Sequence, residues 1–314
     1  MDYSTRRRSG RLVQTVSLAA IGALCWWLVR NTLTSLDQRG ISLGFDFLRQ
    51  PANFAVGDTP WLHVQPDDSV ARAIAAGLLN TARVSVVGCL LAITLGFVLG
   101  VLRIARTPAV RGLVRAGVDA VRGTPLLLLL LFLAALLHGL PPAHAAFHPL
   151  PGVFLSDRGL VLPLPGDVPH LTGFNFTGGL TLSPEFAALL LALVLHHAAH
   201  ISEVVRGAIL AVPRGQIDAA YALGLSRMQT VRWVTLPHAV RAMVPLLATN
   251  CVSLIKNTSL AVAIGFPDVT SVLNTTGNQT GHNIETMLIM IAVYLTLSLA
   301  VAAALDRYNR RLLR

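Results

Sequence analysis

Long apolar stretches, separated by short polar segments, run along almost the whole chain. A membrane-spanning helix needs about 20 mainly apolar residues, and six stretches reach or approach that length: 12–29, 77–102, 124–140, 186–210, 242–266 and 286–305. The third stretch is the shortest, and Pro125 near its start suits a first helical turn, where its missing N–H has no intrahelical partner to lose. The pattern predicts an all-α polytopic membrane protein with six spans.

The composition agrees with a membrane location. Only 13% of the residues are charged and 54% are hydrophobic, with a mean hydropathy of +0.62, whereas a typical soluble domain has about 25% charged residues. This argues against a soluble enzyme, a disordered chain and a nucleic-acid-binding protein. The net charge of +10 comes almost wholly from arginine, because Lys256 is the only lysine.

The distribution of arginine predicts the orientation. If the N-terminus is cytoplasmic, the predicted inner segments hold eighteen basic residues and the outer segments hold five. Cytoplasmic segments are enriched in Lys and Arg because these charges resist translocation. We therefore expect both termini inside the cell. No small-x-small cleavage site follows the first stretch, which favours an uncleaved anchor over a signal peptide.

These expectations divide the chain into three parts: a cytoplasmic tail with an anchor helix (1–31), an external segment (32–76) and a transmembrane domain (77–314). The transmembrane domain contains an external loop (141–185) and a cytoplasmic loop (211–241). The external loop is rich in proline and glycine, which favour turns. We expect it to form an ordered loop or a short hairpin and not a helix.

The cytoplasmic loop has the pattern of two short helices joined by a glycine turn. Residues 216–223 are good helix formers, and Gly224 stands where a left-handed residue commonly ends a helix. Ser226 and Gln229 then have the spacing of a capping box. We expect the second helix to end before Pro237, because the residue that precedes a proline disfavours helical dihedral angles.

This loop resembles the EAA loop of ABC importer permeases, whose signature reads E-A-A-x3-G-x9-I-x-L-P. The matching positions are Asp218, Ala219, Ala220, Gly224, Val234, Leu236 and Pro237. The chain departs from the signature in Asp for Glu and Val for Ile, and both changes are conservative. The resemblance implies that the loop supplies coupling helices, which dock into a groove of a cytoplasmic ATPase.

Other segments narrow the resemblance. RGTPLLLLLLF, ISEVVRGAI and LIKNTSLAVAIGFPDV resemble the polar amino-acid permeases, while NTLTSLDQRGISLGFDFL and LPGVFLSDRGL resemble the larger general L-amino-acid permeases. The resemblance implies a type I ABC importer permease fold with a five-span core, here preceded by one N-terminal anchor span, in the inner membrane of a bacterium. The larger relatives carry extra membrane segments in the middle, where this chain has only the external loop.

The resemblance also implies the partners. They are a dimer of cytoplasmic ABC ATPases, a second permease subunit (a sister permease or another copy of this chain), an external solute-binding protein, an amino-acid substrate and membrane lipid. The chain contains no phosphate-binding loop G-x-x-x-x-G-K-[ST], so ATP and Mg are expected on the partner ATPase, with no cofactor here. No nucleic-acid partner and no catalytic residue are expected.

Polar side chains within the predicted spans are candidates for the translocation pathway, since charges inside a bilayer are costly and usually face a pathway or a partner. The candidates on the fourth and fifth spans are His196, His200, Glu203, Thr249, Ser253, Lys256 and Asn257. The first three share one helical face, and so do Thr249, Ser253 and Lys256. Two interpretations of the histidines remain open: they line the pathway, or they satisfy one another between helices.

Lys256 suits the carboxylate of an amino acid, and residues 256–259 are a candidate break in the helix that lines a cavity. A Glu203–Lys256 ion pair is the alternative, although the two residues lie at different depths in their spans. Zinc binding is not expected, because the His196/His200 spacing lacks the glutamate of an HExxH motif. Arg83 is expected to extend towards the membrane surface.

The sequence thus predicts the permease subunit of an ATP-driven, binding-protein-dependent amino-acid importer, which is not an enzyme. The alternative is a secondary transporter or channel that works alone. Ion-coupled transporters commonly have inverted repeats with broken helices in both halves, and only one half here has a candidate break. An intramembrane hydrolase would need a G-x-S-x-G elbow or paired aspartates in the spans, and the sequence has neither.

Overall fold

The computed structural model describes residues 3–38, 44–173 and 175–312. The chain forms two compact units, Met1–Asp46 and Phe47–Arg314. The first unit consists mainly of helix α1 (Tyr3–Gln38), whose window Val13–Thr32 is long and apolar enough to cross a membrane. Its side chains in this window are exposed, as expected of an apolar helix that is surrounded by lipid.

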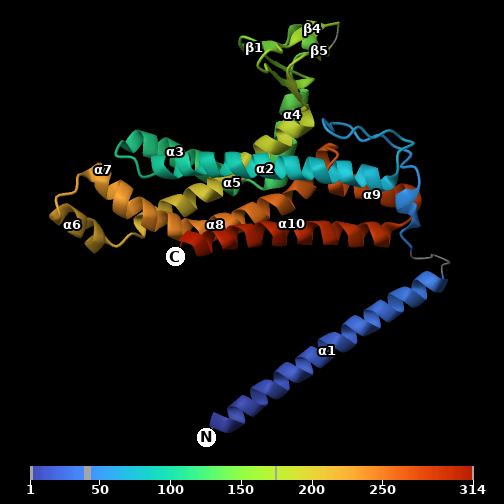
Figure 1. The fold of residues 1–314 in the computed structure, drawn as a ribbon, viewed down its shortest axis with the longest axis horizontal. Coiled ribbons are helices and arrows are strands. Elements are labelled where there is room, and N and C mark those ends of the chain that lie inside the picture. The colour runs from blue at the N-terminus through green and yellow to red at the C-terminus, as the bar shows by residue number, and fades with distance from the viewer. Residues whose placement is uncertain (1–2, 39–43, 174, 313–314) are drawn as a thin grey trace. The chain divides into compact units, whose positions relative to one another are not determined.

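The second unit is built on long helices that pack against one another (Figure 1). They are α2 (Val70–Leu102), α5 (Pro184–Leu210), α8 (Leu236–Asn257) and α10 (Asn283–Leu312). The shorter helices are α3 (Pro108–Gly123), α4 (Leu126–His138), α6 (Arg214–Ala222), α7 (Arg227–Thr230) and α9 (Val269–Thr280). In Figure 1, α6 and α7 lie at one end of this unit and α9 lies near the other.

The described residues contain five helices long and apolar enough to span a membrane, or up to six if a bent pair counts as one span. The bent pair is α3 with α4, at the third predicted span. Helix α4 has 13 residues, or about 20 Å at 1.5 Å per residue, against a hydrocarbon core of about 30 Å. The two helices bend by 103°, because Thr124 before Pro125 adopts an extended conformation (φ −94°, ψ 126°).

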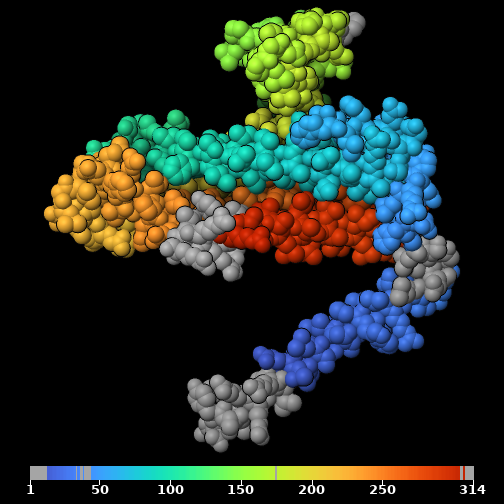
Figure 2. Space-filling view, in the orientation of Figure 1, coloured from blue at the N-terminus to red at the C-terminus, as the bar shows by residue number. Residues whose placement is uncertain are grey.

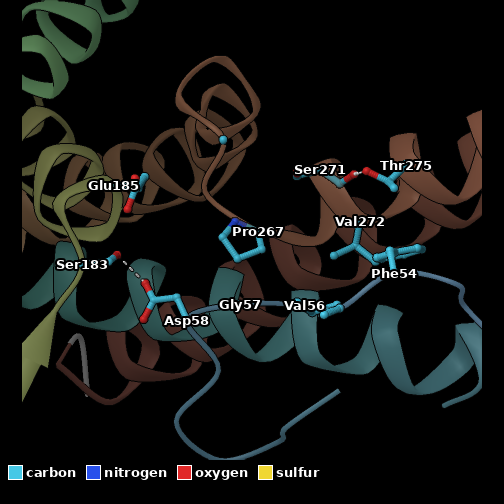
Figure 3. Close-up of a pocket in the computed structure, with 12 residues that line it drawn as sticks. Phe54, Val56, Gly57, Asp58, Ser183, Glu185, Pro267, Ser271, Val272 and Thr275 are labelled. Carbon is cyan, nitrogen blue, oxygen red and sulfur yellow. Dashed lines mark hydrogen bonds between the residues drawn. The ribbon is translucent and has the colours of Figure 1, made fainter. Parts of the chain in front are cut away.

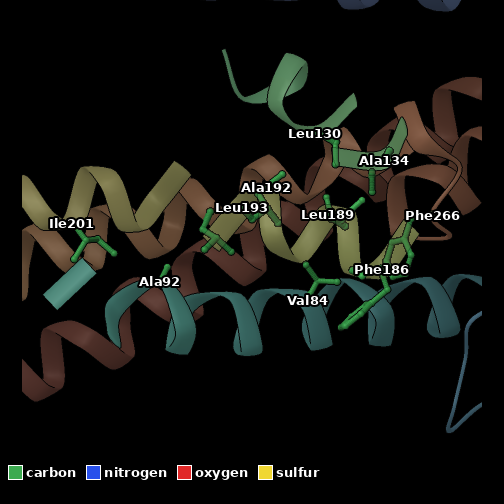
Figure 4. Packing of buried hydrophobic residues seen from close by; sticks show 14 of the residues in the cluster. Val84, Ala92, Leu130, Ala134, Phe186, Leu189, Ala192, Leu193, Ile201 and Phe266 are labelled. Atoms are coloured by element: carbon green, nitrogen blue, oxygen red, sulfur yellow. The ribbon is translucent and has the colours of Figure 1, made fainter. Parts of the chain in front are cut away.

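The main apolar core lies where α2, α4, α5 and α8 meet, and Figure 4 shows Val84, Phe186 and Leu193 within it. Small residues bring α2 and α5 together. A β-carbon on Gly100 would lie 2.6 Å from the Val205 Cβ and 2.8 Å from the Ser202 carbonyl oxygen. Glycine is therefore required at this crossing, as is common where membrane helices pack closely.

A second, smaller core joins the segment before α2 to the start of α2 and to α9. Phe47, Val56 and Val64 are buried with the start of α2, and the Phe47 ring stacks on His282 at 4.7 Å between ring centroids. Helix α2 begins at Val70, earlier than the predicted span, with the N–H of the third residue of the helix bonded to the Ser69 hydroxyl.

The described residues of segment 141–185 form six short strands, with more β-structure than the ordered loop or short hairpin that we expected. Strands β1 (Phe147–Leu150), β2 (Val153–Ser156), β3 (Gly159–Leu162) and β6 (Leu180–Leu182) form an antiparallel sheet in that order. Strands β4 (His170–Thr172) and β5 (Asn175–Thr177) form a separate hairpin. In Figure 1 this region projects from the ends of α4 and α5.

Candidate functional site

The turn between α6 and α7 has the predicted glycine geometry. Gly224 adopts a left-handed conformation, with φ at +80°, and the Leu225 N–H donates to the Ala220 carbonyl at 3.1 Å. This bond satisfies a carbonyl that the end of α6 would otherwise leave unpaired. The turn joins two short helices through backbone hydrogen bonds.

The predicted capping box is also present. The Ser226 N–H donates to the Gln229 Oε1 at 2.8 Å, and the Gln229 N–H donates to the Ser226 hydroxyl at 3.4 Å. Two backbone N–H groups at the start of α7 are therefore satisfied by side chains, which fixes where the helix begins.

The prediction that this helix ends before Pro237 is wrong. Helix α7 passes into a π-helical turn (Val231–Thr235, η3 in chain order) and then into α8, so that one helical segment runs from Arg227 to Ile264. In the π-turn the Leu236 N–H bonds to the Val231 carbonyl, five residues back. The hydrogen-bond ladder is thus already shifted where the proline has no N–H to donate, and the helix continues.

The EAA positions lie on an exposed part of the chain. Asp218, Ala219 and Gly224 are exposed, whereas Ala220 is buried. Large apolar side chains are exposed in the same loop: Tyr221, Leu223, Met228, Val231 and Trp233. Figure 2 shows this loop protruding at one end of the second unit. Exposed apolar surface of this kind marks a site of contact with another protein or with a membrane.

The histidines on α5 contact one another and α8. The rings of His196 and His200 lie 4.8 Å apart between centroids, and the His196 ring also meets the His197 ring. The Asn257 Nδ2 lies 3.2 Å from the His197 Nε2. The structure thus joins predicted Asn257 to a buried histidine that the sequence reasoning missed. Its only sequence signal is its place beside His196.

The remaining α8 candidates lie on one exposed face of the helix. Thr249, Ser253 and Lys256 are exposed, and the Thr249 hydroxyl donates to the Pro245 carbonyl at 3.3 Å. The α-helix ends at Asn257 and continues as a 3₁₀-helix (Thr258–Ile264). The candidate break is therefore a change of helix type, in which the backbone tightens instead of unwinding.

Glu203 pairs with arginines and not with Lys256. The Arg103 Nη1 lies 2.6 Å from the Glu203 Oε2, the Arg122 Nη1 lies 3.7 Å away, and Arg206 also pairs with this carboxylate. Within the described residues, the alternative Glu203–Lys256 pair does not form. The arginines come from the C-terminal ends of α2, α3 and α5, so Glu203, near the end of α5, has cationic partners close by.

A cavity of about 570 Å³ lies between α5 and α8, within the range of about 300–1,000 Å³ that small-molecule sites occupy. His200 and Glu203 line it, together with Val204, Leu246 and Asn250. Two residues of the predicted polar face of α5, His200 and Glu203, therefore line this cavity. His196, Thr249, Ser253 and Lys256 are not among its lining residues in the described structure.

A second cavity, of about 460 Å³, lies between the segment before α2, the start of α5 and the start of α9 (Figure 3). The Ser183 hydroxyl donates to the Asp58 Oδ2 at 2.7 Å. The Arg83 Nη1 lies 3.5 Å from the Asp58 Oδ1. Burial raises the pKa of Asp58, although the Ser183 hydrogen bond and the Arg83 charge oppose that shift.

The expectation that Arg83 extends to the surface is wrong. Its side chain is 9% exposed, and its guanidinium lies over the Phe186 ring at 3.9 Å from the centroid. The folded segment before α2 supplies Asp58 as a partner, so this arginine is buried with an ion pair and an aromatic face. No local pattern in the sequence links Asp58 to Arg83, because the two residues lie far apart along the chain.

None of the residues that the structure describes form a group of three or more His, Cys, Asp and Glu suited to a metal ion. The candidate residues described so far lie in three regions: the exposed loop at α6 and α7, the cavity between α5 and α8, and the cavity at the start of α9. Each lies at or between the ends of apolar helices.

Comparisons with known proteins agree on one family. The profile described as "Binding-protein-dependent transport system inner membrane component" matches residues 92–314. The amino-acid ABC transporter permease protein YhdX of Escherichia coli is 34% identical, with 96% of this chain and 93% of that protein covered. The general L-amino acid transport system permease protein AapQ of Rhizobium johnstonii is 31% identical, with 95% and 91% covered.

Two solved structures are similar in fold. An amino acid ABC transporter crystallised with histidines matches with a TM-score of 0.58 at 21% identity, covering 77% of this chain and 94% of that one. The inward-facing MetNI methionine ABC transporter matches with a TM-score of 0.56 at 20% identity, covering 77% and 97%. These likenesses support the predicted type I importer permease fold.

Proposed function

Since the chain belongs to the family of binding-protein-dependent transport inner-membrane components and is the permease component of an ABC amino-acid importer, we propose that ATP hydrolysis by a separate subunit drives its transport cycle. The family is a transport permease and not an enzyme. In this proposal ATP and Mg bind to a dimer of ATPase subunits in the cytoplasm, and this chain holds no cofactor.

The observation that carries the proposal is the exposed loop at α6 and α7. Two short helices, a left-handed glycine and a capping box give it a fixed shape, and its exposed apolar side chains offer surface to a partner. A rigid element with such a surface suits the transmission of movement from an ATPase. Asp218, Ala219, Ala220, Gly224, Val234, Leu236 and Pro237 are the proposed coupling residues.

The pathway is proposed along α5 and α8. The exposed α8 face with Thr249, Ser253 and Lys256 is available to a second permease subunit, either a sister chain or another copy. Substrate would pass between the two subunits, with the Lys256 ammonium placed to attract an amino-acid carboxylate. The cavity lined by His200 and Glu203 lies between the same helices. In this proposal it forms the end of the pathway through which the substrate leaves.

Both termini are proposed to lie in the cytoplasm of a bacterial cell, with the strands of 141–185 outside, where they would help to dock the solute-binding protein. This orientation places the coupling loop on the ATPase side and Asp58 on the side from which substrate arrives. The excess of arginine on the proposed inner side supports it.

Reconstitution tests the proposal. Proteoliposomes containing the permease, its co-purifying ATPase and the binding protein should concentrate a labelled amino acid only when ATP is present on the ATPase side. The permease alone should let the label equilibrate at most. Accumulation driven by an ion gradient in the permease-only vesicles would refute the importer and favour a secondary transporter.

A further inference from the structure

A third cavity, also of about 570 Å³, lies at the ends of α2, α3 and α5, and arginines dominate its lining. We call it the arginine cavity, after the five that line it: Arg103, Arg111, Arg115, Arg122 and Arg206. Two carboxylates, Asp119 and Glu203, also line it. The lining therefore carries three positive charges in excess.

The carboxylates do not neutralise the side of the cavity formed by α3. Glu203 pairs with Arg103, Arg122 and Arg206, as described above. The Asp119 carboxylate lies 3.4 Å from the Arg115 Nε and 3.7 Å from the Arg103 Nη2. Arg111 forms no ion pair with any residue that the structure describes, and the Arg115 side chain is 72% exposed. These two guanidiniums are thus available to an anion from outside the chain.

Helix α3 has the character of a helix that lies in a membrane interface. Arg111 and Arg115 share one of its faces, four residues apart, while Leu113 on another face is 78% exposed and Val110 is exposed as well. Figure 2 shows α3 on the surface of the second unit. A basic amphipathic helix with an exposed apolar face binds in the plane of the lipid headgroups.

The position of the arginine cavity along the apolar helices fits the depth of the lipid headgroups. Arg103 directly follows the apolar helix α2, and Arg206 lies in the last part of α5. Arginines at the ends of two membrane helices lie where hydrocarbon gives way to headgroups. The arginine cavity is therefore next to lipid on its apolar side and next to water on its charged side.

We propose that the arginine cavity binds the phosphate headgroup of an anionic phospholipid. Guanidinium groups bind phosphate oxygens through paired, charge-assisted hydrogen bonds. Arg111 has no ion pair with any described residue, and Arg115 contacts Asp119 through its Nε alone, which leaves its two terminal amino groups for the phosphate. Leu113 and Val110 are exposed to the acyl chains. A free phosphate ion would satisfy the same guanidiniums but would make no use of the exposed apolar face.

Native mass spectrometry of the full chain in detergent can test this site with added phosphatidylglycerol or phosphatidylcholine. The parent should bind phosphatidylglycerol about tenfold or more tightly than phosphatidylcholine, since each basic residue near an anionic headgroup contributes to binding. The double variant Arg111→Ala/Arg115→Ala should lose that preference. The control, Arg214→Ala/Arg227→Ala, has the same change of charge in the loop at α6 and α7 and should retain it.

Both α3 arginines are exposed, and an exposed ion pair such as Arg115–Asp119 contributes little to stability, so the double variant should melt at the temperature of the parent. Three results would overturn the proposal: no preference for phosphatidylglycerol in the parent, an equal loss in the control, or displacement of the lipid by a few millimolar sodium phosphate. The last result would assign the cavity to a free anion.

Discussion

At the scale of single residues, the backbone conformation of Gly224 requires glycine, but the space around it does not. Its φ is +80°, and a β-carbon built there meets nothing within 4 Å. Gly224→Val should therefore cost about 1 kcal/mol or more through backbone strain alone, while the variant still inserts and accumulates nearly normally. We expect ATP-driven uptake to fall steeply, and the ATPase to lose its response to the loaded binding protein.

The matched control for this glycine is Ala222→Val, two residues earlier in the same loop. Ala222 is exposed and helical, so the added methyl groups need no left-handed backbone. Uptake assays on both variants decide the point. If Gly224→Val transports as well as Ala222→Val, the glycine turn has no part in coupling.

Asp58 gives the structure a pH dependence of known sign. Burial raises the pKa of its carboxyl, so the folded protein holds this proton more tightly than the unfolded chain does. The free energy of unfolding should therefore be highest below the ordinary Asp pKa of about 3.9 and should fall as the pH rises through the raised pKa. Asp58→Asn should remove this part of the pH dependence.

Thermal melting of the detergent-solubilised protein from about pH 4 to pH 7, around the ordinary carboxyl pKa, measures the effect. The melting temperature of Asp58→Asn should fall less with rising pH than that of the parent. Asp67→Asn, on the exposed part of the same segment, should follow the parent. Identical profiles for all three proteins would mean that Asp58 is not the titrating group.

At the scale of elements, the close contact between α2 and α5 depends on glycine, which has no side chain to keep the two helices apart. A methyl group on Gly100 would overlap Val205, whereas one on Gly88 would meet the Leu254 side chain at an ordinary 3.4 Å. Gly100→Ala should lower stability by about 1–3 kcal/mol, as overpacking usually does. Gly88→Ala should cost less, and Gly117→Ala, in open space on α3, should cost nothing. Melting curves of the three variants rank these costs.

Elements with local sequence signals were predicted well. The apolar runs predicted α2, α5, α8 and α10, and the glycine turn with its capping box depends on neighbours within a few residues. Helix α3 was missed because its short amphipathic pattern lies between two spans. The π-turn at Val231–Thr235 was missed because it depends on how the chain enters α8.

The partners of the candidate residues could not be read from the sequence. Glu203 and Arg103 are a hundred residues apart along the chain and meet only after α2 packs on α5. The same holds for Asp58 with Arg83 and for His197 with Asn257. Helical spacing shows which side chains share a face, but it does not show which helix that face will meet.

At the scale of the whole molecule, the orientation in the membrane is open to direct measurement. In a cysteine-free background, a thiol from Pro165→Cys on the strand region should react with a membrane-impermeant maleimide in intact spheroplasts. A thiol from Leu223→Cys, in the exposed loop at α6 and α7, should react only after lysis. The reverse pattern would invert the proposed topology and place the loop away from any cytoplasmic ATPase.

The continuity of the helical segment from Arg227 to Ile264 has a mechanical consequence for the proposed importer. Arg227, where the segment leaves the coupling loop, and Lys256 on α8 lie about 44 Å apart along the segment at 1.5 Å per residue. A helical segment that moves as one body acts as a lever, so a small tilt imposed by the ATPase at one end becomes a larger sideways displacement at the other. The stroke that opens the pathway would then be set by the length of this lever and by the position of its pivot.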